Sequence, residues 1–328
     1  MDFYELVKKE LTEVEMEMEQ VIPREPKEVY SLLIPFFQRG GKRIRPALTI
    51  IYCAALGGDA SKAILPATII ELFHNFTLIH DDIEDNSLMR RGQPTLHVSH
   101  GIPIALNSGD AFYTLIWDVI ANIDWPPQKL IELQKMYSSS FRRVVEGQGI
   151  ELAWYRDNKF DITEQDYFDM ISGKTAALIG LSCEVGGYLV GADKKKLQSL
   201  RIFGEKLGLA FQIQDDILNI IGNFKIYKKE IAGDITEGKR TLMVVKVFEK
   251  AKTEEKEQLR KILKSNTRDE KELNFAVSLF RKYDSIDYAK NVATRLTEEA
   301  KKEISWLPET KYKKALIQLA DFVVNREQ

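Results

Sequence analysis

The residues most suited to binding a metal ion are Asp81, Asp82 and Asp85, the first acidic motif, which is followed by Arg90 and Arg91. Apolar residues recur at helical spacing before it, so we expect a helix that carries Asp81 and Asp85 on one face. Carboxylates one turn apart repel unless they are solvated, paired or neutralised. Oxygen ligands without Cys or His favour Mg²⁺, which typically takes one or two carboxylates plus substrate phosphates.

The alternative to a magnesium site is an ordinary solvated helix end, and a second copy of the pattern favours the metal. Asp215, Asp216 and Asn219 form the second acidic motif, which again follows an apolar helical approach. Asn219 stands where a third aspartate would complete the pattern, and an Asn oxygen can coordinate through water. We therefore expect a metal held mainly by Asp215. Because both motifs have to converge, we expect residues 1–328 to form one domain.

A third segment, Gly40-Gly41-Lys42-Arg43-Ile44-Arg45-Pro46, precedes both motifs. With this segment, the chain resembles the trans-isoprenyl diphosphate synthases, and most closely the geranylgeranyl diphosphate synthases of archaeal type. The motifs follow the family's order between residues 40 and 241. The resemblance implies condensation of isopentenyl diphosphate with an allylic diphosphate, with about three Mg²⁺ ions neutralising the leaving group. It also implies a homodimer.

The resemblance assigns roles to individual residues. Those implied for catalysis are Asp81, Asp82, Asp85, Lys174, Thr175, Gln212 and Asp215, with Asp81, Asp85 and Asp215 as metal ligands. Those implied for substrate binding are Lys42, Arg45, His74, Arg90, Arg91, Lys174, Thr175, Gln212, Lys229 and Lys239. Guanidinium groups suit bidentate phosphate contact, and lysine supplies a point charge. The alternatives are simple surface charge for Lys42 and Arg45 and a satisfied core residue for His74.

Two further positions depend on the same resemblance. The family has a Gly-Gln-x-x-Asp segment where this chain has Gln148 and Glu151, and the longer acid leaves a metal-linked role for Glu151 open. The C-terminus of some members closes over the site, so Arg326 is a candidate for that contact.

The product length is expected to depend on the helix before the first acidic motif. In the family, an aromatic residue five positions before the first aspartate, followed by a small residue, resembles the twenty-carbon pattern. Phe76 and Thr77 occupy these positions here. Along a helix, Phe76 would lie roughly 7.5 Å and Phe73 roughly 12 Å from Asp81. We expect a C20 product with Phe76 as the floor; the alternatives are a farnesyl or longer product, or an ordinary core role for Phe76.

Two rival functions have to be weighed. A class I terpene cyclase shares the first motif, but its second motif would need Ser or Thr at position 223 and Glu at position 227, where this chain has Asn223 and Tyr227. A non-catalytic subunit of a heteromeric synthase would be expected to lose aspartates or the Lys42 and Arg45 pair. Only Asn219 departs from the pattern, which favours the enzyme.

Composition and net charge indicate what kind of protein this is and which partners it lacks the charge to bind. Hydrophobic residues make up 44% and charged residues 29% of the 328 residues, so the chain can bury a sizeable core. Its net charge of −2 provides no electrostatic case for nucleic-acid binding. Cys53 and Cys183 are the only cysteines, which indicates a reducing compartment. The charged N-terminus and the lack of a run of about 18 apolar residues predict a cytoplasmic protein without a membrane span.

Helices have to position these residues, because sustained alternation of apolar and polar residues is absent and the chain has only 19 Gly and 10 Pro. We expect an all-α fold, a single large helical bundle around a central active-site cavity. The family resemblance implies that this is the isoprenoid synthase fold. The strongly apolar helix expected at residues 107–123 would be buried in the core or in a subunit interface. Four helices are expected after residue 253, as scaffold.

Overall fold

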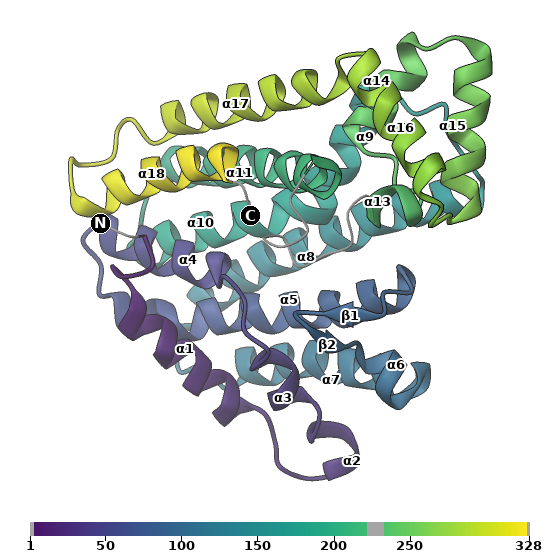
Figure 1. The fold of residues 1–328 in the computed structure, drawn as a ribbon. Coiled ribbons are helices and arrows are strands. Elements are labelled where there is room, and N and C mark those ends of the chain that lie inside the picture. The colour runs from purple at the N-terminus through teal and green to yellow at the C-terminus, as the bar shows by residue number, and fades with distance from the viewer. Residues whose placement is uncertain (1–2, 222–232, 327–328) are drawn as a thin grey trace. The chain divides into compact units, whose positions relative to one another are not determined.

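The computed structural model describes residues 3–221 and 233–326, and α-helices make up nearly all of its regular structure (Figure 1). The only strands in this part of the chain are β1 (Met89–Arg90) and β2 (Gln93–Pro94). They pair antiparallel, with Met89 opposite Pro94. The prediction of an all-α fold is confirmed.

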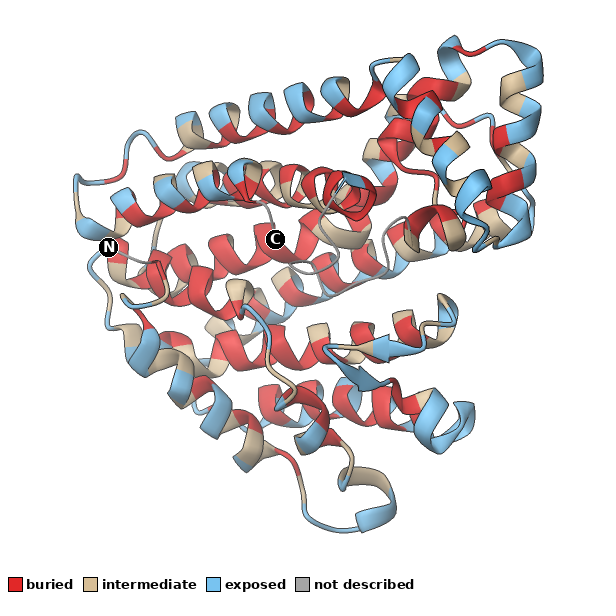
Figure 2. Cartoon of the chain, viewed as in Figure 1, coloured by how far each residue is buried: buried red, intermediate tan, exposed pale blue. Residues whose placement is uncertain are grey.

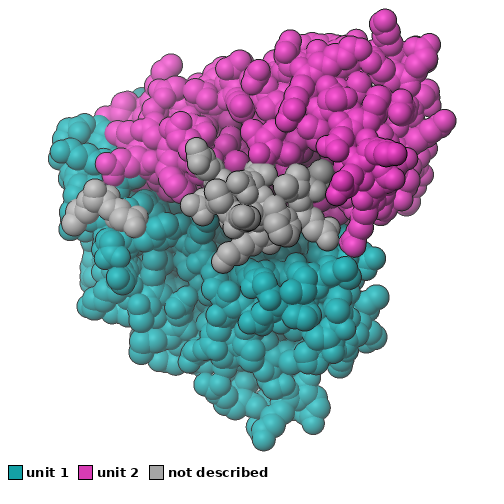
Figure 3. Space-filling view, viewed as in Figure 1, with its two compact units in different colours: residues 1–141, 181–201, 307–315 teal, residues 142–180, 202–306, 316–328 magenta. Residues whose placement is uncertain are grey.

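The chain forms two compact units, each assembled from three segments (Figure 3). Unit 1 consists of residues 1–141, 181–201 and 307–315, and unit 2 of residues 142–180, 202–306 and 316–328. The first acidic motif lies in unit 1 and the second in unit 2. A single domain around a central cavity stays a prediction.

Unit 1 is built around one long helix, α5 (Ile64–Glu84), which is buried on most of its surface (Figure 2). It packs against α1, α4 and α7. The other elements that lie wholly in unit 1 are α1 (Lys8–Val21), α2 (Lys27–Tyr30), α3 (Leu33–Phe37), α4 (Ile44–Ala55), η1 (Ala60–Ala63), β1, β2, α6 (Leu96–His100) and α7 (Ile102–Ala121).

The stretch Ala60–Glu84, which contains α5, is long and apolar enough to cross a membrane by length and composition, and the mean hydropathy of its most apolar window is 1.2. Of its most apolar window, 67% is buried inside the protein. Its acidic Glu71 is also buried, and the carboxylate pairs with Arg43 at 2.7 Å. This burial is what the core helix of a folded unit shows. No other described helix of at least 18 residues meets the same test.

The end of α5 sets the geometry of the first acidic motif. The helix continues through Asp81 and Asp82, as expected, and Asp85 is its C-cap residue. The Asp85 N–H donates to the Asp81 carbonyl oxygen at 2.8 Å, so these two residues keep the one-turn relation of a helix. Asn86 follows with φ 52°, in the left-handed conformation that commonly ends helices.

The predicted apolar helix at residues 107–123 corresponds to α7 (Ile102–Ala121). One face is buried, with Phe112, Ile116 and Ile120 among its buried residues. Other apolar side chains of α7 are exposed; they are Ile102, Ile104, Leu106, Tyr113 and Trp117. One face of α7 therefore belongs to the core of unit 1. Contact of its exposed face with a second subunit stays a prediction.

Unit 2 positions the second acidic motif. Its own elements are α9 (Glu164–Ile171), η2 (Ser172–Ala176), α13 (Gly233–Thr236), α14 (Leu242–Lys250), α15 (Thr253–Ser265), α16 (Glu270–Lys282) and α17 (Ser285–Glu303). Four helices contribute residues to both units: α8 (Pro127–Arg156), α10 (Ala177–Leu189), α11 (Lys194–Ile221) and α18 (Lys311–Asn325). The four helices expected after residue 253 are thus α15 to α18, and Figure 2 shows α17 with one buried and one exposed face.

Candidate active site

In the first acidic motif, the middle carboxylate differs from the outer two. Asp82 is buried, and its Oδ1 accepts from Arg90 Nε at 2.6 Å. Burial outweighs this ion pair and raises the pKa of Asp82 to about 6. Asp81 and Asp85 are partly exposed. Asp81 and Asp85 are therefore the accessible carboxylates of the motif, while Asp82 holds Arg90.

The turn at Gly40 and Gly41 brings Arg91 next to the predicted phosphate-binding segment. Both glycines have positive φ, +89° and +145°, which side chains rarely adopt. Arg91 Nη1 donates to the Gly40 carbonyl oxygen. A Cβ atom on Gly41 would lie 2.7 Å from Arg91 Nη2, so the guanidinium can approach only because this residue is a glycine.

Arg45 and His74 extend this basic cluster. Arg45 Nη1 lies 3.3 Å from His74 Nε2. Burial lowers the pKa of His74 well below its ordinary value, and the charges of Arg45, Arg91, Arg90 and Arg43 lower it further. The imidazole is therefore neutral near pH 7 and can act as a hydrogen-bond donor. The structure brings Arg45, His74 and Arg91 together, as the family resemblance implied, with exposed Lys42 on the same segment.

The arginines of this segment have different partners. Arg43 is buried and pairs with Glu71 at 2.7 Å and Glu15 at 3.1 Å, so its charge is compensated within unit 1. Arg45 makes no ion pair with a carboxylate in the described part of the chain, and its buried Nε has no hydrogen-bond partner there. Clustered cations without a carboxylate are unfavourable unless an anion binds them. Arg45, His74 and Arg91 thus have the properties of an anion site.

The residues predicted to limit product length form an aromatic group between α5 and α7. The Phe76 ring lies 5.5 Å from Phe73 and 5.2 Å from Tyr113, measured between centroids. Phe73 is fully buried and stacks on Phe141 at 3.7 Å, whereas Phe76 is only half-buried. The Thr77 hydroxyl donates to the His74 carbonyl oxygen. Phe76 is thus the more accessible of the two phenylalanines.

In unit 2, Lys174 and Thr175 lie on η2, a π-helical turn between α9 and α10. Such turns are rare and frequently occur at functional sites. The backbone of α8 approaches this turn closely. A Cβ atom on Gly147 would lie 2.2 Å from the backbone nitrogen of Lys174. A Cβ on Gly173 would likewise lie 2.5 Å from the Arg143 carbonyl oxygen. Two glycines are therefore required for this contact.

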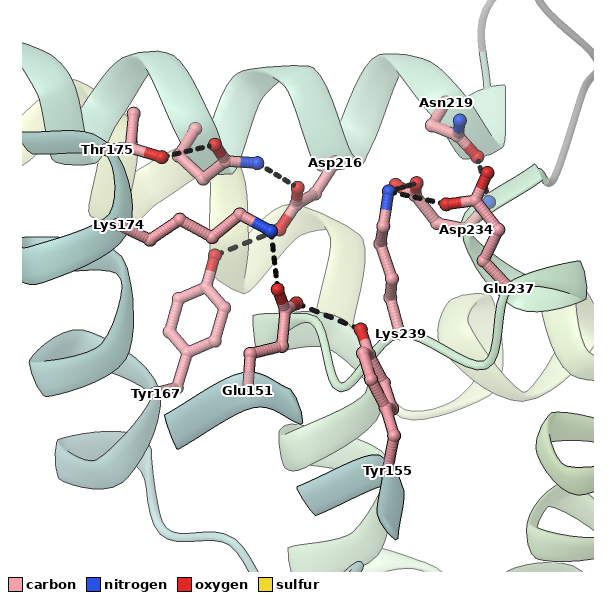
Figure 4. Close-up of polar contacts among 11 residues, drawn as sticks. Glu151, Tyr155, Tyr167, Lys174, Thr175, Asp216, Asn219, Asp234, Glu237 and Lys239 are labelled. Atoms are coloured by element: carbon pink, nitrogen blue, oxygen red, sulfur yellow. Dashed lines mark hydrogen bonds and ion pairs between the residues drawn. The ribbon is translucent and has the colours of Figure 1, made fainter. Parts of the chain in front are cut away.

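Glu151 is a partner of Lys174 (Figure 4). Their Oε2 and Nζ atoms are 2.5 Å apart, and Tyr155 donates to the other carboxylate oxygen at 2.9 Å. Burial opposes ionisation of Glu151, but the charges of Lys174 and Lys239 lower its pKa below the ordinary value. Glu151 is therefore the ion-pair partner that orients Lys174.

Each residue of the second acidic motif has a different partner. Asp215 Oδ1 lies 3.1 Å from Arg326 Nη2. Asp216 is buried, and burial with the charge of Asp234 raises its pKa well above the ordinary range. Asn219 accepts a hydrogen bond from the Asp234 backbone N–H at 2.9 Å through Oδ1. Only Asp215 of this motif is thus both partly exposed and a carboxylate.

The resemblance also assigned Lys229 and Lys239 to phosphate binding. Lys239 pairs with Asp234 at 2.9 Å and Glu237 at 2.7 Å. Lys229 lies outside the described residues.

Sequence reasoning missed Tyr167 and Asp234, which contact the second motif, because no motif or spacing marks them.

Within the described residues, no three His, Cys, Asp or Glu side chains gather closely enough to hold a metal by themselves. The accessible carboxylates, Asp81 and Asp85 in unit 1 and Asp215 in unit 2, still offer the oxygen donors that Mg²⁺ prefers. Carboxylates of this kind, one or two in each motif, suit ions that take their remaining ligands from phosphate and water.

Comparison with known proteins gives one matching family model and similar sequences. A family model described as polyprenyl synthetase matches residues 26–280. A short chain isoprenyl diphosphate synthase from Methanothermobacter thermautotrophicus is 38% identical over 289 residues, which cover 88% of this chain and 87% of that protein.

Two solved structures share the fold along almost the whole chain. Geranylgeranyl pyrophosphate synthetase from Pyrococcus horikoshii Ot3 has a TM-score of 0.92 and 34% identity, covering 99% of this chain and 98% of that one. Polyprenyl synthase from Caulobacter crescentus CB15, complexed with calcium and isoprenyl diphosphate, has a TM-score of 0.90 and 26% identity, covering 99% and 97%. The chain therefore belongs to the polyprenyl synthetase family.

Proposed function

We propose that this protein condenses isopentenyl diphosphate head-to-tail with allylic diphosphates in a Mg²⁺-dependent reaction, and that geranylgeranyl diphosphate is the main product. The observation that carries the proposal is the cluster of Arg45, His74 and Arg91 beside the first acidic motif. Cations without a carboxylate partner suit a diphosphate, and the accessible carboxylates suit its metal. The relatives named for isoprenyl and geranylgeranyl products support the same reaction.

The substrate-binding groups divide between the units. In unit 1, Lys42, Arg45, His74 and Arg91 would bind the diphosphate of isopentenyl diphosphate, and Arg90, which is oriented by Asp82, would contact the allylic diphosphate. In unit 2, Lys174 would contact the allylic diphosphate and Lys239 would be a further phosphate-binding lysine. Lys229, which lies outside the described residues, is proposed for the same role from the family resemblance alone. These cations would stabilise the charge that develops on the leaving diphosphate.

Asp81, Asp85 and Asp215 would hold Mg²⁺, with about three ions per site. Bound Mg²⁺ would supply neutralisation of the diphosphate leaving group. The Caulobacter crescentus structure with calcium and isoprenyl diphosphate supports a divalent cation beside this class of substrate. Because each motif supplies only one or two accessible carboxylates, metal and diphosphate should bind together.

In the proposed reaction, the allylic C–O bond breaks, and the double bond of isopentenyl diphosphate attacks the allylic cation to form a C–C bond. A proton is then lost to the released diphosphate. Thr175 would direct its oxygen toward the cation, and Gln212 would hold Thr175. Protein side chains thus bind and orient both substrates, and no covalent enzyme intermediate is needed.

The first experiment measures product length with purified protein, Mg²⁺ and isopentenyl diphosphate, with dimethylallyl, geranyl or farnesyl diphosphate as the primer. We expect a dominant C20 product from all three primers. A C15 product, or products of C25 and longer, would support the condensation reaction but contradict the proposed C20 product length. No Mg²⁺-dependent product would instead favour a non-catalytic subunit.

A second experiment tests Phe76 as the floor of the product channel. The half-buried ring should block elongation, so Phe76→Ala should shift the product beyond C20. The matched control is Phe322→Ala, which removes an exposed phenylalanine on α18 and should leave the product unchanged. An unchanged product length in Phe76→Ala would exclude this role.

A homodimer is a further part of the proposal. It is supported by the exposed apolar side chains of α7, which include Tyr113 and Trp117. Light scattering of the purified protein should give twice the chain mass. A monomeric mass would contradict it.

A further inference from the structure

Four side chains of unit 2 form one continuous chain of hydrogen bonds (Figure 4). Tyr167 Oη donates to Asp216 Oδ2 at 2.9 Å, and Gln212 Nε2 donates to Asp216 Oδ1 at 2.8 Å. Thr175 Oγ1 donates to Gln212 Oε1 at 2.8 Å. Tyr167 and Asp216 are the buried end of this chain, with exposures of 1% and 5%.

The direction of each hydrogen bond follows from Asp216. An amide can present either its NH₂ group or its oxygen, but the carboxylate oxygen Oδ1 only accepts. The NH₂ group of Gln212 must therefore face Asp216, and its oxygen must face Thr175. A proton on Oδ2, toward Tyr167, would leave Oδ1 an acceptor. The orientation of the amide in the structure is thus compatible with either charge state of Asp216.

Thr175 has one hydroxyl proton, and this proton is used in the hydrogen bond to Gln212. Its oxygen lone pairs must then point away from Gln212. Thr175 lies on the π-helical turn beside Lys174, which is the lysine assigned to the allylic diphosphate. A reversed amide would instead make the hydroxyl point its proton away from Gln212, toward a developing cation.

We propose that Asp216, held by Tyr167, is a positioning residue that orients the Gln212 amide so that Thr175 presents oxygen lone pairs to the allylic cation. This inference rests on the proposed function, because it needs an allylic cation next to Thr175. It also distinguishes Asp216 from a metal ligand, since both carboxylate oxygens are already used within the protein.

The test compares three variants at the level of a single turnover, because product release often limits kcat. Asp216→Leu removes the acceptor and should lower the single-turnover rate about 10- to 100-fold while both KM values change less than about threefold. Asp216→Asn retains an oxygen acceptor for the amide and should recover at least about a third of the rate. Tyr167→Phe should lower the rate about three- to tenfold.

Tyr137→Phe is the matched control. Tyr137 is also a fully buried tyrosine, and its hydroxyl donates to the Pro66 carbonyl oxygen at 3.0 Å in unit 1. The variant should lose thermal stability as Tyr167→Phe does but keep the wild-type single-turnover rate. If Asp216→Leu fails to fold, the comparison of Tyr167→Phe with Tyr137→Phe still decides the question.

A double-mutant cycle tests whether the effect of Asp216 on the rate is transmitted through the Gln212 amide. In a Gln212→Leu background, Asp216→Leu should cause less than about a twofold further loss, because its effect is transmitted by the amide. Additive losses would overturn the inference. Equal inactivity of Asp216→Asn and Asp216→Leu, with a higher Mg²⁺ requirement, would also overturn it and would indicate metal binding. An inactive wild-type protein would instead refute the proposed function, so the two failures are distinct.

Discussion

The two acidic motifs have nearly the same spacing but different surroundings. The first lies at the end of α5, where Asp81 and Asp85 are partly exposed and only Asp82 is buried. The second lies within α11, where Asp216 and Asn219 are both buried and only Asp215 is partly exposed. A helix end therefore presents two carboxylates of the pattern, whereas a buried helix face presents one.

The partners of the middle aspartates differ in the same way. Asp82 contacts a cation, Arg90, and so orients a residue assigned to substrate binding. Asp216 contacts Tyr167 and Gln212, which are neutral, and so orients an amide. The same position in two similar motifs thus performs two different tasks. Four predictions test this contrast, from the largest expected effect to the smallest.

The first prediction concerns the accessible carboxylates. Asp81→Asn should lower kcat/KM by about a thousandfold or more, roughly 4 kcal/mol, because it removes a charged metal ligand. Steady-state kinetics at saturating Mg²⁺ measure the effect. Asp124→Asn, which changes an exposed aspartate of the loop after α7, should have almost no effect. A loss below tenfold for Asp81→Asn would remove this residue from the metal site.

The second prediction concerns stability and pH. The folded-state pKa of Asp82, about 6, lies above its ordinary value, so the native protein binds more protons than the unfolded chain. The stability that Asp82 contributes is present below pH 4 and is lost as the pH rises through 6. Relative to Asp82→Asn, the wild type should lose about 3 kcal/mol of unfolding free energy over this range.

The measurement is denaturant unfolding of both proteins in EDTA at a series of pH values. The corresponding loss for Asp216, compared with Asp216→Asn, should have the same sign and extend to higher pH, because its pKa is also raised by burial. Parallel pH profiles for the wild type and Asp82→Asn would show that Arg90 compensates the buried charge.

The third prediction exchanges the last residues of the two motifs. Asp85→Asn should lower kcat/KM about 10- to 100-fold and raise the Mg²⁺ requirement, because it removes an accessible ligand. Asn219→Asp should bring no gain in activity, since Asn219 is buried and hydrogen-bonded to the Asp234 backbone. A higher activity or Mg²⁺ affinity of Asn219→Asp would mean that position 219 can reach a metal.

The fourth prediction concerns Arg326, whose guanidinium pairs with Asp215. The Arg326 guanidinium occupies one carboxylate oxygen, so Arg326→Ala should lower the apparent Mg²⁺ dissociation constant about fivefold, roughly 1 kcal/mol. Calorimetric titration with Mg²⁺ and inorganic pyrophosphate measures it. Arg295→Ala, which removes an exposed arginine of α17, is the control. Weaker Mg²⁺ binding in Arg326→Ala would show that Arg326 supports the ion instead of competing with it.

Sequence reasoning predicted much of the site in unit 1. The helix through Asp81 and Asp82 followed from apolar periodicity. The proximity of Arg45, His74 and Arg91 was implied by the family resemblance. These features are predictable because they depend on local backbone preferences and on a recognisable order of motifs.

The site in unit 2 was less predictable. The sequence left the role of Glu151 open, and it did not indicate that Tyr167 would contact Asp216, 49 positions later. It also left open whether Asn219 coordinates a metal, and it did not indicate that the Asn219 oxygen accepts from the backbone N–H of Asp234. Each of these contacts joins residues on different elements.

The sequence by itself determined the helical fold, the family and the positions of the charged groups, because periodicity and motif spacing are properties of neighbouring residues. Only the tertiary structure decided which of these groups are accessible and which are used internally. The physical reason is that burial and hydrogen-bond partners depend on how separate helices pack. Adjacent aspartates such as Asp215 and Asp216 therefore look alike in the sequence but have different environments in the folded protein.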